Sequence, residues 1–320
     1  MRADMEVQAN PLNRKGIWAA TLRFLDSDIV YSFRQSRITV AASVVMLVVV
    51  LAAVCAPLLS THNPFDPLSY DLMDAEYPPV WMEGGDARFF LGTDNQGRDM
   101  LSAILYGSRI SMAVGFFSII FAMVVGIPIG LLSGYVGGTL DAVLMRIADV
   151  QLSFPAILIA LLIDGLARGV LPSELRQDLA IYVMVFAIGI SHWVLFARTV
   201  RGSCMVEKNK EYVQAARIVG RYPISIMIRH ILPNIMGPVL VIATINFAMA
   251  VLTEATLSFL GVGVPPTEPS LGTLIRIGND FLFSGLWWIT IFPGVMLVVL
   301  TLSVNLLGDW LRDALNPKLR

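Results

Sequence analysis

The chain has 320 residues, of which 56% are hydrophobic and 15% are charged, and its formal net charge is −1. Soluble domains carry about 25% charged residues, so this composition, with a mean hydropathy of +0.71, excludes an ordinary water-soluble fold. Cys55 and Cys204 lie in an apolar run and a basic loop, which predicts neither a disulfide framework nor a metal site. The chain is therefore predicted to be an all-α integral membrane protein.

Six apolar runs approach the roughly 20 residues that a membrane-spanning helix needs. The predicted spans are residues 38–59, 110–134, 142–163, 179–197, 235–260 and 283–307. The third run contains Arg146 and Asp149, whose spacing allows them to pair on one helix face. The first run is longer than the apolar core of about 7–15 residues in a cleavable signal peptide, so it is predicted to be a span.

Basic residues indicate how the spans are oriented. They are concentrated before the first span, between spans four and five, and at the C-terminus, whereas the loop 61–107 has two Arg and eight acidic residues. Because Lys and Arg favour the cytoplasmic side, both termini and the basic loop are predicted to be cytoplasmic. The predicted organisation is a cytoplasmic segment 1–37, a first span 38–60, an extracytoplasmic loop 61–107, a core of five spans 108–308 containing the cytoplasmic loop 201–234, and a cytoplasmic tail 309–320.

The segment 211–234, EYVQAARIVGRYPISIMIRHILPN, is unusual for a loop between two spans. Its composition predicts two short helices with a hinge at Gly220, and Ala215 and Ala216 are small enough for close contact with a partner. The alternative is an ordinary surface helix that ends at a glycine cap. On the first interpretation the segment is a docking surface for another protein.

No catalytic apparatus is evident in the chain. It has no phosphate-binding G-x-x-x-x-G-K-[ST] loop, and its three histidines are scattered. Only Arg146, Asp149 and Glu254 are ionisable candidates inside the spans, fewer than ion-coupled transport requires. We expect a transport subunit that binds no cofactor, is not an enzyme, and uses energy from a partner.

Residues 214–233 resemble the EAA loop of the membrane subunits of ABC importers. Gln214-Ala215-Ala216, Gly220 and Leu232-Pro233 match its spacing, although Gln214 stands where the family has glutamate and Glu211 lies one turn earlier. The resemblance extends over residues 25–320 and includes LGTDNQGRDMLSAILYGSRIS (91–111), GYVGGTLDAVLMRIADVQLSFPAILIA (134–160), LTEATLSFLGVGVPP (252–266) and NLLGDWLRDALNPKLR (305–320). These segments are similar to the C-type subunit of the dipeptide/oligopeptide/nickel branch.

The resemblance implies a type I ABC importer permease with six transmembrane helices, in a bacterial inner membrane. It also implies a second homologous permease chain, two ATP-binding subunits that use ATP in the cytoplasm, and an extracytoplasmic substrate-binding protein. The implied cargo is a short peptide, and the alternative is nickel or another small solute. An ion-coupled carrier or channel is the alternative from a different class, distinguished by transport without an ATPase.

The resemblance implies that one helix of the basic loop rests in a groove of an ATPase. The residues assigned to this coupling role are Glu211, Gln214, Ala215, Ala216, Arg217, Gly220, Leu232 and Pro233. A carboxylate inside a span is costly, so Glu254 is predicted to face the translocation path or a polar partner on a neighbouring helix.

The turn-rich segment 92–99 precedes the second span. Its residues Gly92, Asp94, Arg98 and Asp99 are predicted to brace the outer mouth or to touch the binding protein. The alternative is a capped turn in which Asp94 or Asn95 starts the next helix.

Overall fold

The computed structural model describes residues 28–60, 62–66, 68–265 and 267–315, and all the regular secondary structure in these ranges is helical. Five of the helices are long and apolar enough to cross a membrane: α3 (Arg37–Val54), α5 (Met100–Val136), α8 (Ser173–Glu207), α11 (Leu232–Phe259) and α13 (Trp288–Ala314). The prediction of an all-α membrane protein is confirmed.

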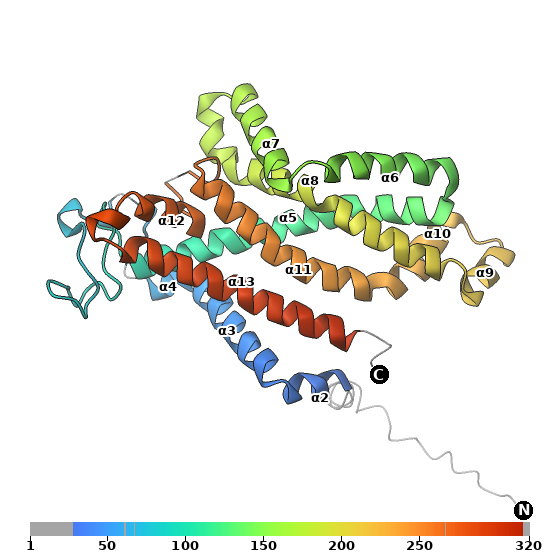
Figure 1. The fold of residues 1–320 in the computed structure, drawn as a ribbon, viewed down its shortest axis with the longest axis horizontal. Helices are drawn as coiled ribbons and strands as arrows, with labels where there is room; N and C mark the ends of the chain where they lie inside the picture. The colour runs from blue at the N-terminus through green and yellow to red at the C-terminus, as the bar shows by residue number, and fades with distance from the viewer. Residues whose placement is uncertain (1–27, 61, 67, 266, 316–320) are drawn as a thin grey trace, which may run out of the picture.

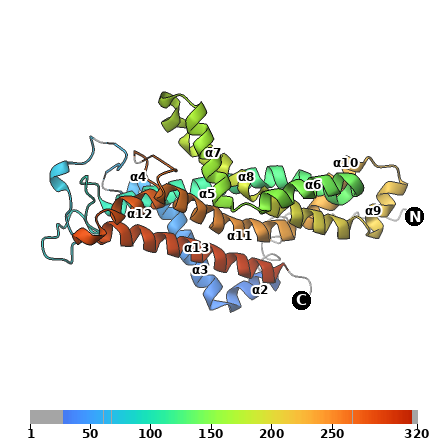
Figure 2. The ribbon, with the colours of Figure 1, turned by 45° about the horizontal axis from the view of Figure 1, so that its top comes forward.

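The third predicted span is not one helix. Two helices, α6 (Gly138–Leu152) and α7 (Ala156–Val170), cover it and meet at 87°, and α7 stands away from the bundle (Figures 1 and 2). The break falls at Ser153-Phe154-Pro155, because a proline disfavours helical geometry in the residue before it. With the bent pair taken as one crossing, the bundle has the six predicted spans.

The connections gather at the two ends of the bundle. A long loop, residues 62–99, lies at one end with α12 (Leu271–Asn279), and α9 (Glu211–Ile218) lies at the other (Figure 1). The other elements in the described part of the chain are short: α2 (Asp28–Gln35), α4 (Ala56–Leu59), η2 (Leu72–Asp74), α10 (Pro223–Ile226), the π-helical turn η3 (Met227–Ile231) and η4 (Leu282–Ser284).

Several helix ends differ from the predicted boundaries. Helix α5 begins at Met100, inside the predicted loop 61–107, and α13 continues past 308 to Ala314. Of the predicted N-terminal segment and C-terminal tail, residues 1–27 and 316–320 lie outside the described residues. Helix α2 packs against the end of α13, where the rings of Phe33 and Trp310 are 5.1 Å apart.

A row of glycines on α5 determines how it packs against α8. Gly126, Gly130 and Gly134 recur every fourth residue and so line one face. A β-carbon at Gly130 would lie 2.5 Å from the carbonyl oxygen of Ala197, and β-carbons at Gly126 and Gly134 would lie 2.5 and 2.8 Å from carbonyl oxygens of α8. Small residues at this spacing let membrane helices approach backbone to backbone. This contact forms the centre of the bundle.

Candidate coupling surface and polar sites

The α8–α11 connection, residues 208–231, is helical on both sides of Gly220. It contains α9 and α10, then the π-helical turn η3, and α11 begins at Leu232 with Pro233 in its first turn. Helix α10, the turn η3 and α11 follow one another without a break, so Pro233 lies inside the helical run Pro223–Phe259. A proline inside a helix removes one N–H donor, and the π-helical turn directly precedes it. The expected break at Gly220 and the short helix before it, α9, are confirmed, whereas the second short helix, α10, is the beginning of the long helical run that leads into α11.

Gly220 closes α9 with a Schellman motif. Its φ is +80°. The Gly220 N–H donates to the carbonyl oxygen of Arg217 at 3.0 Å, and the Arg221 N–H donates to the carbonyl oxygen of Ala216 at 3.1 Å. This geometry places the residue after the cap in the left-handed region, which favours glycine. Gly220 is therefore a glycine cap at the end of α9, as the alternative interpretation expected. This finding does not test whether the segment docks on another protein.

The connection has one buried and one exposed side. Val213 and Ala216 face the bundle, while Ala215 faces outward. Two apolar side chains at the tip are almost wholly exposed, Ile218 at 87% and Tyr222 at 82%, and Val219 and Ile224 are exposed beside them. A group of exposed apolar side chains marks an interaction site. We call Ile218, Val219, Tyr222 and Ile224 the apolar tip.

Polar contacts hold the connection to the bundle. Lys208 Nζ donates to the carbonyl of Gly134 at 2.6 Å, and the guanidinium of Arg217 lies 4.8 Å from the centroid of the Tyr135 ring. The Tyr212 hydroxyl donates to Glu207 Oε1 at 2.5 Å. Burial and this carboxylate raise the pKa of Tyr212 to about 12. These contacts join the connection to the ends of α5 and α8.

Glu211 and Gln214 lie on the exposed side of α9. The Gln214 amide donates to the carbonyl of Asn209 at 3.1 Å, which ties the first turn of α9 to the end of α8. This hydrogen bond joins two neutral groups, so the contact between Gln214 and Asn209 does not require a charged side chain at position 214.

Ion pairs between distant segments fasten α6 to α8. Arg201 binds both carboxylate oxygens of Asp141, at 2.6 and 2.7 Å. Asp149 pairs with Arg198, so the predicted pairing of Arg146 with Asp149 is wrong. The spacing in the sequence suggested that Asp149 pairs within its own helix, whereas helix packing brings Arg198 of α8 to its carboxylate. Partners 49 and 60 residues apart leave no local signal in the sequence.

Glu254 lies among serines at the junction of α5, α11 and α12. Its side chain is 0% exposed, and Ser258 Oγ donates to its Oε1 at 2.8 Å. Ser111 of α5 and Ser270 before α12 lie beside the same carboxyl group, whose Oε2 has no hydrogen-bond partner among the described residues. This environment agrees with the polar-partner interpretation, and a role in lining the path stays a prediction.

The segment 92–99 forms a buried turn. Gly92, Asp94, Arg98 and Asp99 are all buried, and Arg98 Nε donates to Asp94 Oδ2 at 2.6 Å. Asp99, rather than Asp94 or Asn95, caps α5 by accepting from the Ser102 N–H at 2.9 Å. The side chains of Asp94, Arg98 and Asp99 are buried and hold the turn together, and contact of this segment with a binding protein stays a prediction.

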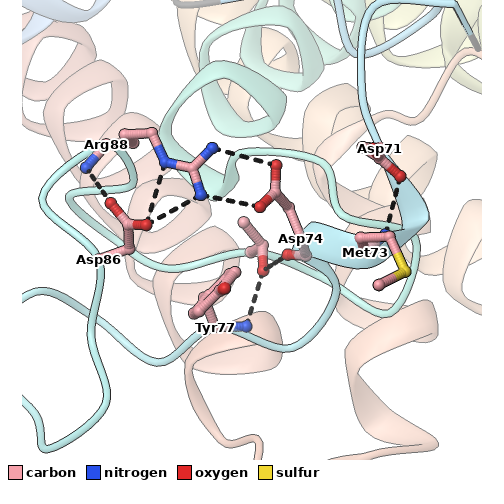
Figure 3. A network of polar contacts seen from close by, with 7 residues as sticks. Asp71, Met73, Asp74, Tyr77, Asp86 and Arg88 are labelled. Atoms are coloured by element: carbon pink, nitrogen blue, oxygen red, sulfur yellow. Dashed lines mark hydrogen bonds and ion pairs between the residues drawn. The ribbon is translucent and has the colours of Figure 1, made fainter.

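A second network, on the exposed side of the long loop, was not predicted (Figure 3). Arg88 bridges Asp74 at 2.8 Å and Asp86 at 2.9 Å, and its hydrogen bonds lower the pKa of Asp86. Thr93 Oγ1 donates to the carbonyl of Asp74 at 2.7 Å and accepts from the Tyr77 N–H at 2.8 Å. Together these bonds join the two halves of the loop above the buried turn.

Asp94→Asn is expected to destabilise the long loop, because it leaves the Arg98 guanidinium, 2% exposed, without a counter-charge. Breaking a buried ion pair costs about 3–5 kcal/mol. The apparent unfolding temperature of the purified protein in detergent should fall clearly. Asp86→Asn, at the exposed pair with Arg88, is the matched control and should change it little. Equal unfolding temperatures for the two variants would contradict the structural role.

Two family descriptions match the chain. Residues 126–320 match the binding-protein-dependent transport system inner membrane component. Residues 27–79 match the N-terminal transmembrane domain of oligopeptide transport permease C. The first covers the glycine-lined end of α5, the bent pair, the α8–α11 connection and everything that follows.

Curated relatives cover nearly the whole chain. The dipeptide transport system permease protein DppC of Haemophilus influenzae is 38% identical over 91% of this chain and 94% of its own length. The di/tripeptide permease DppC of Pseudomonas aeruginosa is 36% identical over 90% and 91%. The oligopeptide permease OppC of Bacillus subtilis is 33% identical over 92% and 90%.

Among solved structures, the inward-facing methionine ABC transporter MetNI has a similar fold. One of its chains matches with a TM-score of 0.53 and 20% identity over 68% of this chain and 98% of that chain. At this identity the match concerns the fold alone, which is that of a type I ABC importer permease. The bent helix pair, the structured α8–α11 connection and these matches agree, and the chain belongs to the family of binding-protein-dependent transport system inner membrane components.

Proposed function

We propose that this chain is the membrane-spanning subunit of an ATP-driven importer and forms half of the translocation path for short peptides. The observation that carries the proposal is the exposed apolar tip, held on a helical connection that is tied rigidly to α5 and α8. The peptide class is supported by relatives named as dipeptide and oligopeptide permeases over about nine-tenths of the chain.

The implied partners follow from this arrangement. Two ATP-binding subunits use the ATP, and the α8–α11 connection of this chain docks on one of them. A second, homologous permease chain supplies the other half of the path, and an extracytoplasmic binding protein delivers the cargo. The chain itself binds no cofactor and catalyses no reaction.

Within the docking surface the residues have different roles. Ala215, Glu211 and Gln214 face the ATPase from the exposed side of α9. Ala216 and Gly220 shape the segment, and Arg217 holds it against Tyr135. Leu232 and Pro233 start α11, which carries the motion toward the Glu254 junction.

The proposed topology places both termini in the cytoplasm of a bacterial cell with an inner membrane. The start of α3 and the end of α13 lie on the side of the bundle away from the long loop, as an even number of crossings requires (Figure 1). The basic flanks of the spans favour the same side.

Ile218→Asp tests the proposal in cells that lack the native gene. The wild-type chain should restore uptake of a labelled dipeptide, and Ile218→Asp should not, because a charge on the apolar tip must be desolvated on docking. The ATPase subunits should co-purify with the wild-type chain and be lost from the variant. Leu72→Asp, on the exposed face of the long loop, is the matched control and should retain both.

Three results would contradict the proposal. Dipeptide uptake that is independent of the gene would overturn the peptide class, and loss of labelled nickel uptake alone would reassign the cargo. ATPase binding that survives Ile218→Asp would remove the apolar tip from the interface.

A further inference from the structure

A cavity of about 310 Å³ lies between α7, the first turns of α8, and the α11–α12 connection. It belongs to none of the sites described above. Its walls carry one acidic side chain, Asp164, and three arginines, Arg168, Arg176 and Arg276. The helices that line it, α7, the start of α8 and α12, lie nearer to the long loop than to α9 (Figure 1). We call it the arginine cavity.

The arginine cavity has an excess of positive charge. Arg168 Nε binds Asp164 Oδ2 at 2.6 Å, which neutralises the acidic group. Arg176 donates its Nε to the carbonyl of Leu171 at 3.0 Å, a bond that orients the guanidinium without neutralising it. Among the residues whose side chains the structure describes, no ion pair neutralises the guanidinium of Arg176 or of Arg276.

Arg276 is an exposed residue of α12 whose guanidinium lies over Gly261 in the α11–α12 connection. Gly261 has a φ of +80°, and a β-carbon there would lie 2.6 Å from Arg276 Nη1. The absent side chain thus leaves the space that the guanidinium occupies. Among the residues that the structure describes, Arg276 has no hydrogen-bond or ion-pair partner. Its donors are free for a ligand.

Helix α7 has an exposed apolar face and a second face that lines the arginine cavity. The exposed apolar residues Leu158, Leu162, Leu166 and Val170 recur every four positions and form one face. Asp164 and Arg168 lie on another face, toward the cavity. Charged groups inside a membrane protein face the bundle interior or water, because contact with hydrocarbon is costly. The cavity is therefore a water-accessible polar site.

We propose that the arginine cavity is an anion subsite that binds the α-carboxylate of the incoming peptide before it crosses. This inference rests on the proposed peptide function. A guanidinium presents paired N–H donors that match the two oxygens of a carboxylate, and such charge-assisted bonds are among the strongest in proteins. A lipid phosphate has the same oxygen-acceptor chemistry and is the competing source of the anion.

Arg276→Gln, in the complete importer reconstituted in vesicles of purely zwitterionic lipid, tests the subsite. Uptake of a dipeptide with a free C-terminus is compared with uptake of the same dipeptide as its C-terminal amide. The binding protein is the same in every sample, so a difference between variants arises in the permease. The variant should lower the carboxylate-to-amide uptake ratio by about tenfold, equivalent to about 1.4 kcal/mol. Arg109→Gln, an exposed arginine on α5 outside the cavity, should leave the ratio unchanged.

A second measurement does not depend on uptake of the amide. Ala180 lines the cavity, and Ala180→Cys is combined with Cys55→Ala and Cys204→Ala to give a single thiol. A negatively charged thiol reagent should modify this cysteine faster than a positively charged one. Arg276→Gln should reduce that preference. Saturating dipeptide, delivered by the binding protein, should slow the modification.

Each contrary result has a distinct meaning. An unchanged uptake ratio together with no protection by dipeptide would overturn the subsite while leaving the importer intact. A variant defect that is equal for both peptides and appears only when anionic lipid is added would assign the cavity to lipid phosphate. Failure of the wild-type importer to take up any peptide would instead overturn the proposed function.

Discussion

Gly220→Val is expected to abolish peptide uptake while the assembled complex continues to hydrolyse ATP. Valine must adopt a φ of +80° at this position, and left-handed geometry costs an L-residue about 1–2 kcal/mol. The chain relieves that strain by opening the Schellman motif between Ala216 and Arg221. The orientation of the apolar tip relative to α9 then changes, and closure of the ATPases no longer moves α5 and α8. The measurement is the ratio of peptide imported to ATP hydrolysed in proteoliposomes.

The control for this experiment is Gly202→Val, which adds the same side chain to a helical glycine of α8. A β-carbon at Gly202 meets no atom within 4 Å, and the residue needs no positive φ. This variant should import peptide at close to the wild-type ratio. A normal ratio in Gly220→Val would show that the motif at the end of α9 has no part in coupling.

Gly130→Leu is expected to prevent the protein from accumulating in a folded state. A β-carbon at this position would lie 2.5 Å from the carbonyl oxygen of Ala197 and 2.8 Å from Val200 Cβ. Neither backbone can yield locally, because α5 and α8 are also in close contact one turn away on each side, at Gly126 and Gly134. Overpacking commonly costs about 1–3 kcal/mol even where side chains can move. We expect a larger loss here, measured as the yield of monodisperse protein after extraction from the membrane.

Gly165→Leu is the matched control on α7, where a β-carbon would meet nothing within 4 Å. It makes the same change in volume inside a helix and should give a yield close to that of the wild-type chain. Comparable yields for the two variants would contradict close packing of α5 on α8.

Sequence reasoning succeeded where the determining interactions are local. Apolar runs of the right length identified the spans, and the spacing of Gly220 after Ala215 and Ala216 identified the α9 hinge. It was wrong where a partner lies far away in the chain. The charge at Asp149 was correctly noticed, but its partner is Arg198 on α8 rather than Arg146 on the same helix.

Burial was the second property that the sequence did not reveal. The polar residues of the segment 92–99 suggested an exposed contact, yet the chain folds them inward around the Asp94–Arg98 pair. Conversely, nothing in the sequence distinguished Ile218 and Tyr222 from apolar residues that become buried, and the structure exposes both at the apolar tip. A hydrophobicity pattern cannot distinguish a side chain covered by its own chain from one left for a partner.

By itself, the sequence determined the membrane environment, the helical class and the positions of the spans, because bilayer thickness and backbone hydrogen bonding leave few other solutions. It also located the connection that carries the proposed docking surface. Only the tertiary structure decided the bend between α6 and α7, the ion pairs that fasten α6 to α8, the burial of Glu254 and the existence of the arginine cavity. These features depend on contacts between segments far apart in the chain, and such contacts form only when the helices pack.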